Sequence, residues 1–245
     1  MSNKLNSASR LFRVFEQANS LPDNTQTLEA WATLLQVDEG NPNKRVLVVG
    51  EQIHAMYREL DLIASGMEAA NFPKALYETV IDKVRHALSP MLFPSTWNQA
   101  KQYFGPDVIT SFAYCSEILP DEESLISGED LDEIRAKVVE LRASLEDVSV
   151  PLRLRILIEH HIDLITKALL EYPISGAKAF REAGRAALGE IIEARDEIAP
   201  ARGTPAVSKL EATWKKINAA ADVAFKAEKI AQLGQRAWES ISSIF

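Results

Sequence analysis

The sequence contains a single cysteine, Cys115, so it cannot form a disulfide within one chain. No apolar run approaches the roughly 18 residues that a membrane-spanning helix requires. The first twenty residues also lack the apolar segment of a signal peptide. These absences argue against a disulfide-stapled scaffold and against an integral membrane protein, and we expect a cytoplasmic protein.

Glycine and proline are scarce as well, with 10 Gly and 11 Pro among 245 residues. Hydrophobic residues make up 47% of the chain and charged residues 25%. This composition is that of an ordinary globular protein and excludes a fibrous repeat or a disordered chain. The length is sufficient for one large helical domain, or for two smaller ones, with a sizeable core.

The sequence lacks the motifs that most often mark nucleotide-binding and catalytic sites. It has no Gly-x-Gly-x-x-Gly, no Gly-x-x-x-x-Gly-Lys-Ser/Thr, no Gly-x-Ser-x-Gly, no His-Glu-x-x-His and no Cys-x-x-Cys. We therefore predict a non-enzymatic protein with no cofactor, no bound metal and no small-molecule substrate. A helical enzyme or metalloprotein whose site carries no motif is the alternative.

The strongest pattern present is a series of apolar residues at three- and four-residue steps. The segment 44–50 taken alone resembles a buried strand that runs into a glycine turn. The spacing continues for three heptads, however, and only a helix places all of its side chains on one stripe. The series is Val46, Val49, Ile53, Met56, Leu60, Ile63 and Met67. It predicts a helix over 44–69 and an all-α fold.

Similar spacing between turn signals predicts further helices and an extended antiparallel bundle of about eight or nine helices. We expect the loop at 120–128 to separate an N-terminal helical region, 1–120, from a C-terminal one, 121–245, although one continuous bundle fits the short connections equally well. The expected ranges are 7–19, 25–36, 73–88, 95–104, 107–119, 131–145, 151–169, 176–198 and one helix from 205 onward.

Two short segments resemble uncharacterised helical proteins of bacteria. They are Leu28-Glu29-Ala30-Trp31-Ala32 and Ala168-Leu169-Leu170-Glu171-Tyr172-Pro173-Ile174-Ser175-Gly176, about a tenth of the chain. The resemblance implies a bacterial origin. It implies no activity, and it transfers no functional residue to this chain.

Acidic charge is concentrated in the middle of the sequence. Residues 101–150 hold four Lys/Arg against twelve Asp/Glu, a net charge of −8 that equals the charge of the whole chain. Such a surface repels phosphate backbones, so we predict no nucleic-acid partner. A basic protein could be attracted to the segment 121–133. The alternative is a solvated loop before a helix whose first turn favours acidic residues.

Two features could carry metal or nucleophile chemistry. Glu51 and His54 have the Glu-x-x-His spacing of di-iron bundles, but they fall outside the apolar stripe and no second copy of the motif exists. We predict that both are surface residues. Cys115 falls on an apolar face, which favours a buried cysteine over a catalytic thiol.

A histidine pair, His160 and His161, forms the other polar cluster of interest. On a helix the two side chains are about 100° apart, so both rings cannot easily bind one ion. His161 adjoins an apolar stripe, whereas His160 faces water. His161 could titrate near neutral pH as a pH-sensitive contact. A hydrogen-bonded histidine of the core is the commoner case.

The last predicted helix is the best candidate for binding a partner. Its apolar positions form one stripe from Val207 to Ile244, and residues 199–245 carry a net charge of +3. A helix of forty residues is about 60 Å long, longer than most bundles can cover. It could fold back on its own bundle, pair with another protein or a second copy, or lie on a membrane.

We therefore predict an interaction or regulatory protein that binds another protein, or a second copy of itself, through long helix faces. A membrane-active effector that uses the last helix is the second hypothesis. The candidate partner-binding residues are Trp214, Ile217, Phe225, Leu233, Trp238, Ile241 and Phe245.

Overall fold

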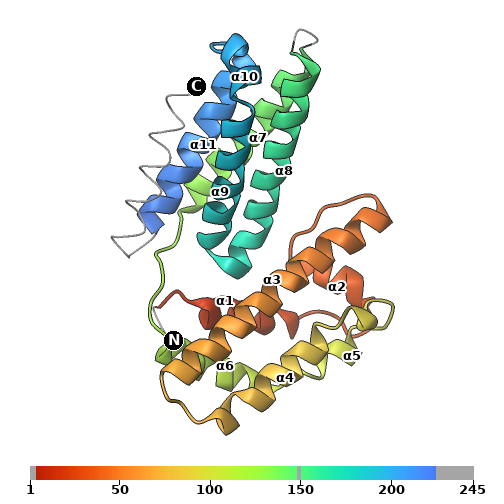
Figure 1. The fold of residues 1–245 in the computed structure, drawn as a ribbon. Coiled ribbons are helices and arrows are strands. Elements are labelled where there is room, and N and C mark those ends of the chain that lie inside the picture. Colours follow the sequence, from red (N-terminus) through yellow and green to blue (C-terminus); the bar gives the residue numbers. More distant parts are fainter. Residues whose placement is uncertain (1–3, 148–149, 225–245) are drawn as a thin grey trace. The chain divides into compact units, whose positions relative to one another are not determined.

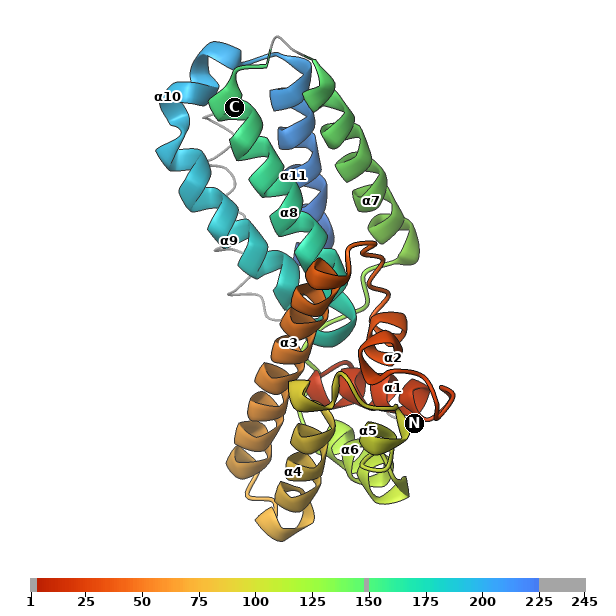
Figure 2. The same ribbon diagram turned by 90° about the vertical axis from the view of Figure 1, so that its right-hand side faces the viewer.

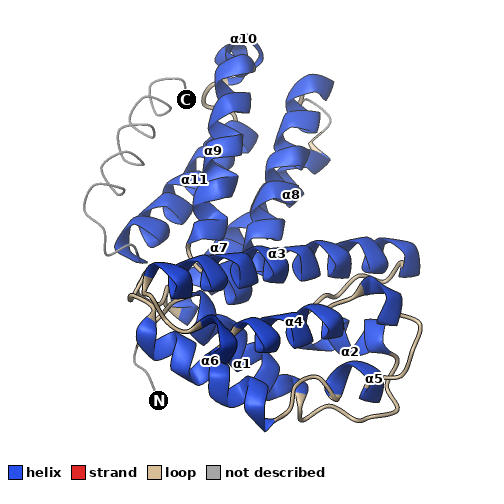
Figure 3. Cartoon of the chain, turned by 60° about the horizontal axis from the view of Figure 1, so that its bottom comes forward, coloured by secondary structure: helices blue, strands red, loops and turns tan. Residues whose placement is uncertain are grey.

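The computed structural model of the protein describes residues 4–147 and 150–224. Regular structure in these ranges is helical, apart from an isolated β-bridge between Gln26 and Thr96, and Figure 3 shows helices joined by loops. The predicted all-α fold is confirmed. Among the described helices, none combines the length and the apolar character that a membrane crossing requires.

The chain divides into two compact units, each with its own hydrophobic core. Unit 1 comprises Met1–Glu122 and Pro173–Gly176, and unit 2 comprises Glu123–Tyr172 and Ala177–Phe245. The boundary between Glu122 and Glu123 lies inside the predicted 120–128 loop. The turn Pro173–Gly176, which the sequence placed in the C-terminal region, belongs to unit 1.

Unit 1 is formed by α1 (Ser7–Ala18), α2 (Thr27–Leu34), α3 (Pro42–Ala69), η1 (Lys74–Leu76), α4 (Glu78–Ala87), η2 (Pro90–Leu92), α5 (Asn98–Lys101) and α6 (Pro106–Ile118). Helix α1 packs against both α3 and α6, and α4 also contacts these two helices, as Figure 2 shows.

Aromatic rings build the core of unit 1. Phe15 of α1 stacks on Phe104 with ring centroids 5.0 Å apart, and it meets Phe112 of α6 edge to face. Trp31 and Trp97 also meet edge to face, at 5.1 Å. Edge-to-face and offset rings are the favoured arrangements of aromatic pairs. These contacts fix α6 against the core and leave its opposite side on the surface.

The long apolar stripe predicted for 44–69 lies on α3. Its members from Val49 to Met67 are at most 2% exposed, whereas Val46, in the first turns of the helix, is 40% exposed. The helix begins at Pro42 because the side chain of Asn41 accepts hydrogen bonds from two backbone N–H groups of the first turn.

Unit 2 contains four long helices, α7 (Gly128–Ala143), α8 (Leu152–Ser175), α9 (Lys178–Glu193) and α11 (Pro205–Ala224). Shorter elements, η3 (Ser144–Glu146), α10 (Arg195–Ile198) and η4 (Ala199–Ala201), follow α7 and α9. Successive long helices run in opposite directions (Figure 1). Their apolar faces meet in one core, which is the arrangement of an antiparallel four-helix bundle.

The largest departure from the predicted helices concerns Pro173, where the sequence predicted a break. Helix α8 continues through Pro173 to Ser175 and ends at Gly176, whose φ of +66° is the left-handed conformation common after helices. A proline removes one backbone donor, and in the last turn this affects a single hydrogen bond. Helix α8 therefore ends six residues beyond the predicted range 151–169, and the predicted break is reduced to Gly176.

Two other predicted helices are shorter than expected. The range 73–88 contains η1 and then α4, with Tyr77 between them, and α5 covers only four residues of the range 95–104. Helix α2 begins at Thr27, two residues after the start of the predicted range 25–36, with Gln26 at the N-cap position.

Candidate functional site

The surface side of α6 carries residues spaced four positions apart, Pro106, Thr110, Tyr114 and Ile118. The buried side of the same helix carries Val108, Phe112 and Cys115. Two hollows in the surface of unit 1 adjoin α6, and Pro106 and Thr110 line both of them. We call the surface formed by the outer side of α6 and these two hollows the α6 face.

The first hollow is apolar, with a volume of about 770 Å³. Helix α6 forms one wall, and the segment from Phe72 to Val80 forms the other. Leu76 and Tyr114 are 58% and 64% exposed although both side chains are large and apolar or aromatic. At one end, Lys83 Nζ lies 2.5 Å from Asp107 Oδ2, and this hydrogen bond lowers the pKa of Asp107. The hollow is thus an apolar groove with a charged end.

Cys115 lines this groove and is only 2% exposed. Burial raises the pKa of its thiol to about 11, so the sulfur is protonated at neutral pH. A protonated thiol is a weak nucleophile. The residue therefore contributes apolar surface to the groove, in line with the buried position predicted from the sequence.

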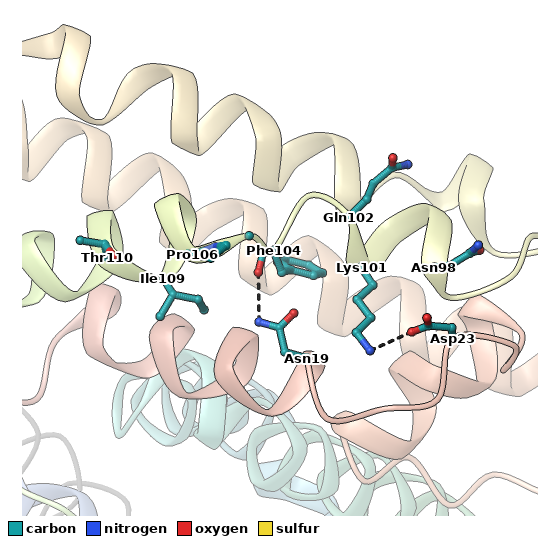
Figure 4. Close-up of a pocket in the computed structure, with 10 residues that line it drawn as sticks. Asn19, Asp23, Asn98, Lys101, Gln102, Phe104, Pro106, Ile109 and Thr110 are labelled. Atoms are coloured by element: carbon teal, nitrogen blue, oxygen red, sulfur yellow. Dashed lines mark hydrogen bonds and ion pairs between the residues drawn. The ribbon is translucent and has the colours of Figure 1, made fainter.

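The second hollow is more polar, with a volume of about 670 Å³ (Figure 4). Asn19 Nδ2 donates to the Phe104 carbonyl at 3.0 Å, and Lys101 Nζ donates to Asp23 Oδ1 at 2.8 Å. The amide side chain of Gln102 also lines the hollow. Amide and carboxylate groups of this kind form hydrogen bonds with backbone groups of a bound chain.

The acidic residues at the end of unit 1 bind other groups of that unit. Asp121 Oδ1 accepts a hydrogen bond from the Leu5 backbone N–H at 3.0 Å. Glu122 Oε2 and the fully buried Glu59 Oε2 lie 2.9 and 3.0 Å from Arg10 Nη2. Arg10 Nε also donates to the Ile174 carbonyl, at 2.9 Å, in the last turn of α8. This cluster holds the Pro173–Gly176 turn in unit 1.

In unit 2, acidic residues of the segment 121–133 also make internal contacts. Glu123 is 5% exposed, and its Oε2 accepts from the Ala177 N–H at 2.7 Å, at the N-terminus of α9. Lys216 Nζ of α11 lies 2.8 Å from Asp130 Oδ1 and 2.5 Å from Glu133 Oε2. The acidic segment 121–133 and the basic last helix thus meet through ion pairs within unit 2.

The histidine pair lies inside unit 2, with one ring buried and the other exposed. His161 is fully buried, and its Nδ1 accepts from Trp214 Nε1 at 2.9 Å. Glu190 of α9 contacts both histidines, with Oε1 2.9 Å from His160 Nε2 and Oε2 3.5 Å from His161 Nε2. Burial lowers the pKa of His161 to about 4, so the ring is neutral at physiological pH. Of the two alternatives for His161, a pH-sensitive contact or a hydrogen-bonded histidine of the core, the structure has the second.

Among the candidate partner-binding residues, Trp214 and Ile217 lie in the core of unit 2, at 1% and 0% exposure. Their side chains are therefore not presented to a partner, and this part of the helix packs on its own bundle. The other five candidates, Phe225, Leu233, Trp238, Ile241 and Phe245, lie outside the described residues.

Glu51 and His54 are exposed on α3, as predicted for surface residues. Within the described ranges, no group of three or more His, Cys, Asp or Glu side chains has the arrangement that a metal ion needs.

The sequence did not predict the α6 face, because periodic apolar residues identify the buried side of a helix and not its exposed side. The apolar pattern identified the buried side of α6. Tyr114 and Ile118 on the opposite side were the residues from which a second apolar surface could have been predicted. Comparison of the chain with family models, with curated proteins and with solved structures finds no match.

Proposed function

We propose that the protein is a non-enzymatic interaction protein, and that the α6 face of unit 1 binds an amphipathic helix of a protein partner. One observation carries this proposal. Two large side chains, Leu76 and Tyr114, are more than half exposed on opposite walls of the apolar groove.

Apolar surface of this kind is stabilised when a partner removes it from water, at about 25 cal/mol per Å². A helix that lies in an apolar groove and inserts side chains at i, i+3, i+4 and i+7 is a common mode of recognition. The 13 residues of α6 span about 20 Å, enough to contact three turns of such a helix. The polar hollow beside Pro106 and Thr110 supplies hydrogen-bonding groups next to the apolar groove, and interfaces generally combine the two kinds of surface.

The proposed setting is the cytoplasm, where a single free thiol such as Cys115 is ordinary. The net negative charge of unit 1, with ten Lys/Arg and fifteen Asp/Glu, disfavours nucleic acid as the partner. A role at a membrane surface through residues 238–245 is the competing proposal, but no described residue supports it.

Site-specific photo-crosslinking tests the proposed function. A benzoylphenylalanine replaces Tyr114 in the full chain, expressed in its native host, and the matched control carries it at Met91, which is 85% exposed but lines neither hollow. We expect one discrete adduct from position 114 that Leu76→Glu abolishes. If position 114 gives no adduct, or gives the same adducts as position 91, the α6 face is not a binding surface.

A further inference from the structure

We propose that the helix bound by the α6 face is the segment 225–245 of a second copy of this chain, exchanged reciprocally so that two copies form a closed dimer. The inference rests on the proposed function and names its partner.

The first observation is the place where the bundle of unit 2 ends. The Ser124 N–H donates to the Ala224 carbonyl at 2.6 Å, which places the last residue of α11 beside the segment that leads into α7. At this end of the bundle α7 begins, at Gly128, and α9 begins, at Lys178. A helix that continued the direction of α11 beyond Ala224 would therefore extend past the core that buries Trp214 and Ile217.

The second observation is that the apolar pattern of α11 does not stop at this end. Residues recur at three- and four-residue steps through the next twenty positions, and two aromatic side chains lie beside them. The recurring residues are Ile230, Leu233, Ala237, Ile241 and Ile244, and the aromatic ones are Trp238 and Phe245. This pattern predicts an amphipathic helix whose apolar face needs a partner.

The groove and the segment are similar in length, and unit 1 as a whole and the segment carry opposite net charges. From 230 to 245 a helix is about 24 Å long, and α6 is about 20 Å long. The segment 225–245 carries three Lys/Arg and two Asp/Glu, whereas unit 1 has an excess of five acidic residues. Opposite net charges favour the encounter of the two surfaces.

Reciprocal exchange accounts for why a second copy is the occupant. Each copy has one groove and one segment, so two copies fill both grooves through the same contact and leave no open site. Closed twofold symmetry is the commonest form of homo-oligomer, and exchange of an identical element is a low-cost route to it.

Isotope-labelled crosslinking tests the proposal on the purified full chain. Equal amounts of ¹⁴N and ¹⁵N protein, each with benzoylphenylalanine at position 114, are mixed, unfolded, refolded together and irradiated. We expect position 114 to crosslink to peptides from 225–245, with about half of the linked pairs of mixed isotope, and sedimentation to give a dimer. Leu76→Glu and Trp238→Glu should each weaken the dimer about 30-fold or more, the effect of losing an interface hot spot, whereas Met91→Glu should not.

Four results would overturn the second-copy inference. If the linked pairs are never of mixed isotope, the segment belongs to the same copy. If the chain sediments as a monomer while position 114 still links to another protein in the host, the proposed function stands and only the partner is wrong. If position 114 links to nothing in either experiment, both proposals fail. A dimer that survives Leu76→Glu and Trp238→Glu would also place the contact elsewhere.

Discussion

At the scale of single residues, the buried charge of Arg10 is compensated by partners from several parts of unit 1. Arg10 is 6% exposed, and its guanidinium contacts Glu59, Glu122 and the Ile174 carbonyl. A buried charge is tolerated when it is paired and hydrogen-bonded, and removal of one partner leaves the other in a poorly solvated place. The stability of unit 1 therefore depends on one side chain that sequence patterns do not identify.

Arg10→Met tests this dependence. We expect the free energy of unfolding of unit 1 to fall by about 3 to 5 kcal/mol, because the carboxylate of Glu59 loses a buried ion pair. The matched control is Arg85→Met, since Arg85 pairs with Asp61 and Asp82 at the surface and should contribute less than about 1 kcal/mol. Urea denaturation gives both values, and equal losses would show that burial of the Arg10 pair has no special effect.

The buried histidine of unit 2 predicts a dependence of stability on pH. Burial lowers the pKa of His161 to about 4, whereas an unfolded histidine has a pKa near 6.5. Between these values the unfolded chain binds a proton that the folded chain does not. Stability is therefore fully present above about pH 6.5 and declines as the pH falls to 4, by about 3 kcal/mol for this shift. The groups that face the ring are Glu190, His160 and Trp214.

The measurement is the unfolding free energy of unit 2 between pH 7 and pH 4.5. In His161→Gln the amide oxygen can still accept from Trp214, but the side chain no longer titrates, so we expect a shallower slope than in the natural sequence. His160→Gln replaces an exposed ring, so most of the pH dependence of the unfolding free energy should remain. An unchanged slope in His161→Gln would assign the acid sensitivity to other groups.

At the scale of elements, periodic apolar patterns in the sequence predicted the helices. Features that depend on a single contact between distant residues were not predicted. The stripe from Val49 to Met67 predicted α3 because a helical face that is buried along about five turns leaves a regular pattern in the sequence. The assignment of Pro173–Gly176 to unit 1 was not predicted, because it involves the distant Arg10, which contacts the Ile174 carbonyl. The α6 face was missed for a related reason, since it is created by packing between α6 and the segment from Phe72 to Val80, far apart in the sequence.

Two glycines of α3 give a matched prediction at this scale. An added Cβ at Gly50 meets nothing within 4 Å, so Gly50→Ala should stabilise the protein by about 0.5 to 1 kcal/mol through helix propensity. At Gly66 the added Cβ would lie 2.6 Å from Leu119 Cδ2, a side chain that is 4% exposed. Gly66→Ala should therefore gain less than Gly50→Ala, or lose stability. Thermal unfolding of both variants measures the two changes in stability. Equal increases in stability would mean that the Leu119 side chain moves aside at no cost.

At the scale of the whole molecule, the two separate cores predict two cooperative transitions. Trp31 and Trp97 belong to the core of unit 1, whereas Trp214 belongs to the core of unit 2, and no buried side chain is shared between the clusters in the described part of the chain. Units with their own cores usually open with their own free energies.

Hydrogen exchange in increasing urea separates the two units without altering any tryptophan. Because Arg10 acts on unit 1, Arg10→Met should bring exchange of α1, α3 and α6 to lower urea while the amides of α7, α9 and α11 keep their protection. Lowering the pH from 7 to 4.5 should do the reverse through His161, since its protonation disfavours only the folded bundle of unit 2. If both changes shift every helix together, the chain unfolds as one cooperative body despite its two cores. If Arg10→Met shifts only the helices of unit 1, and the lower pH only those of unit 2, the units unfold independently. A partner bound to the α6 face then stabilises unit 1 alone, and its binding can be measured as slower amide exchange in α6.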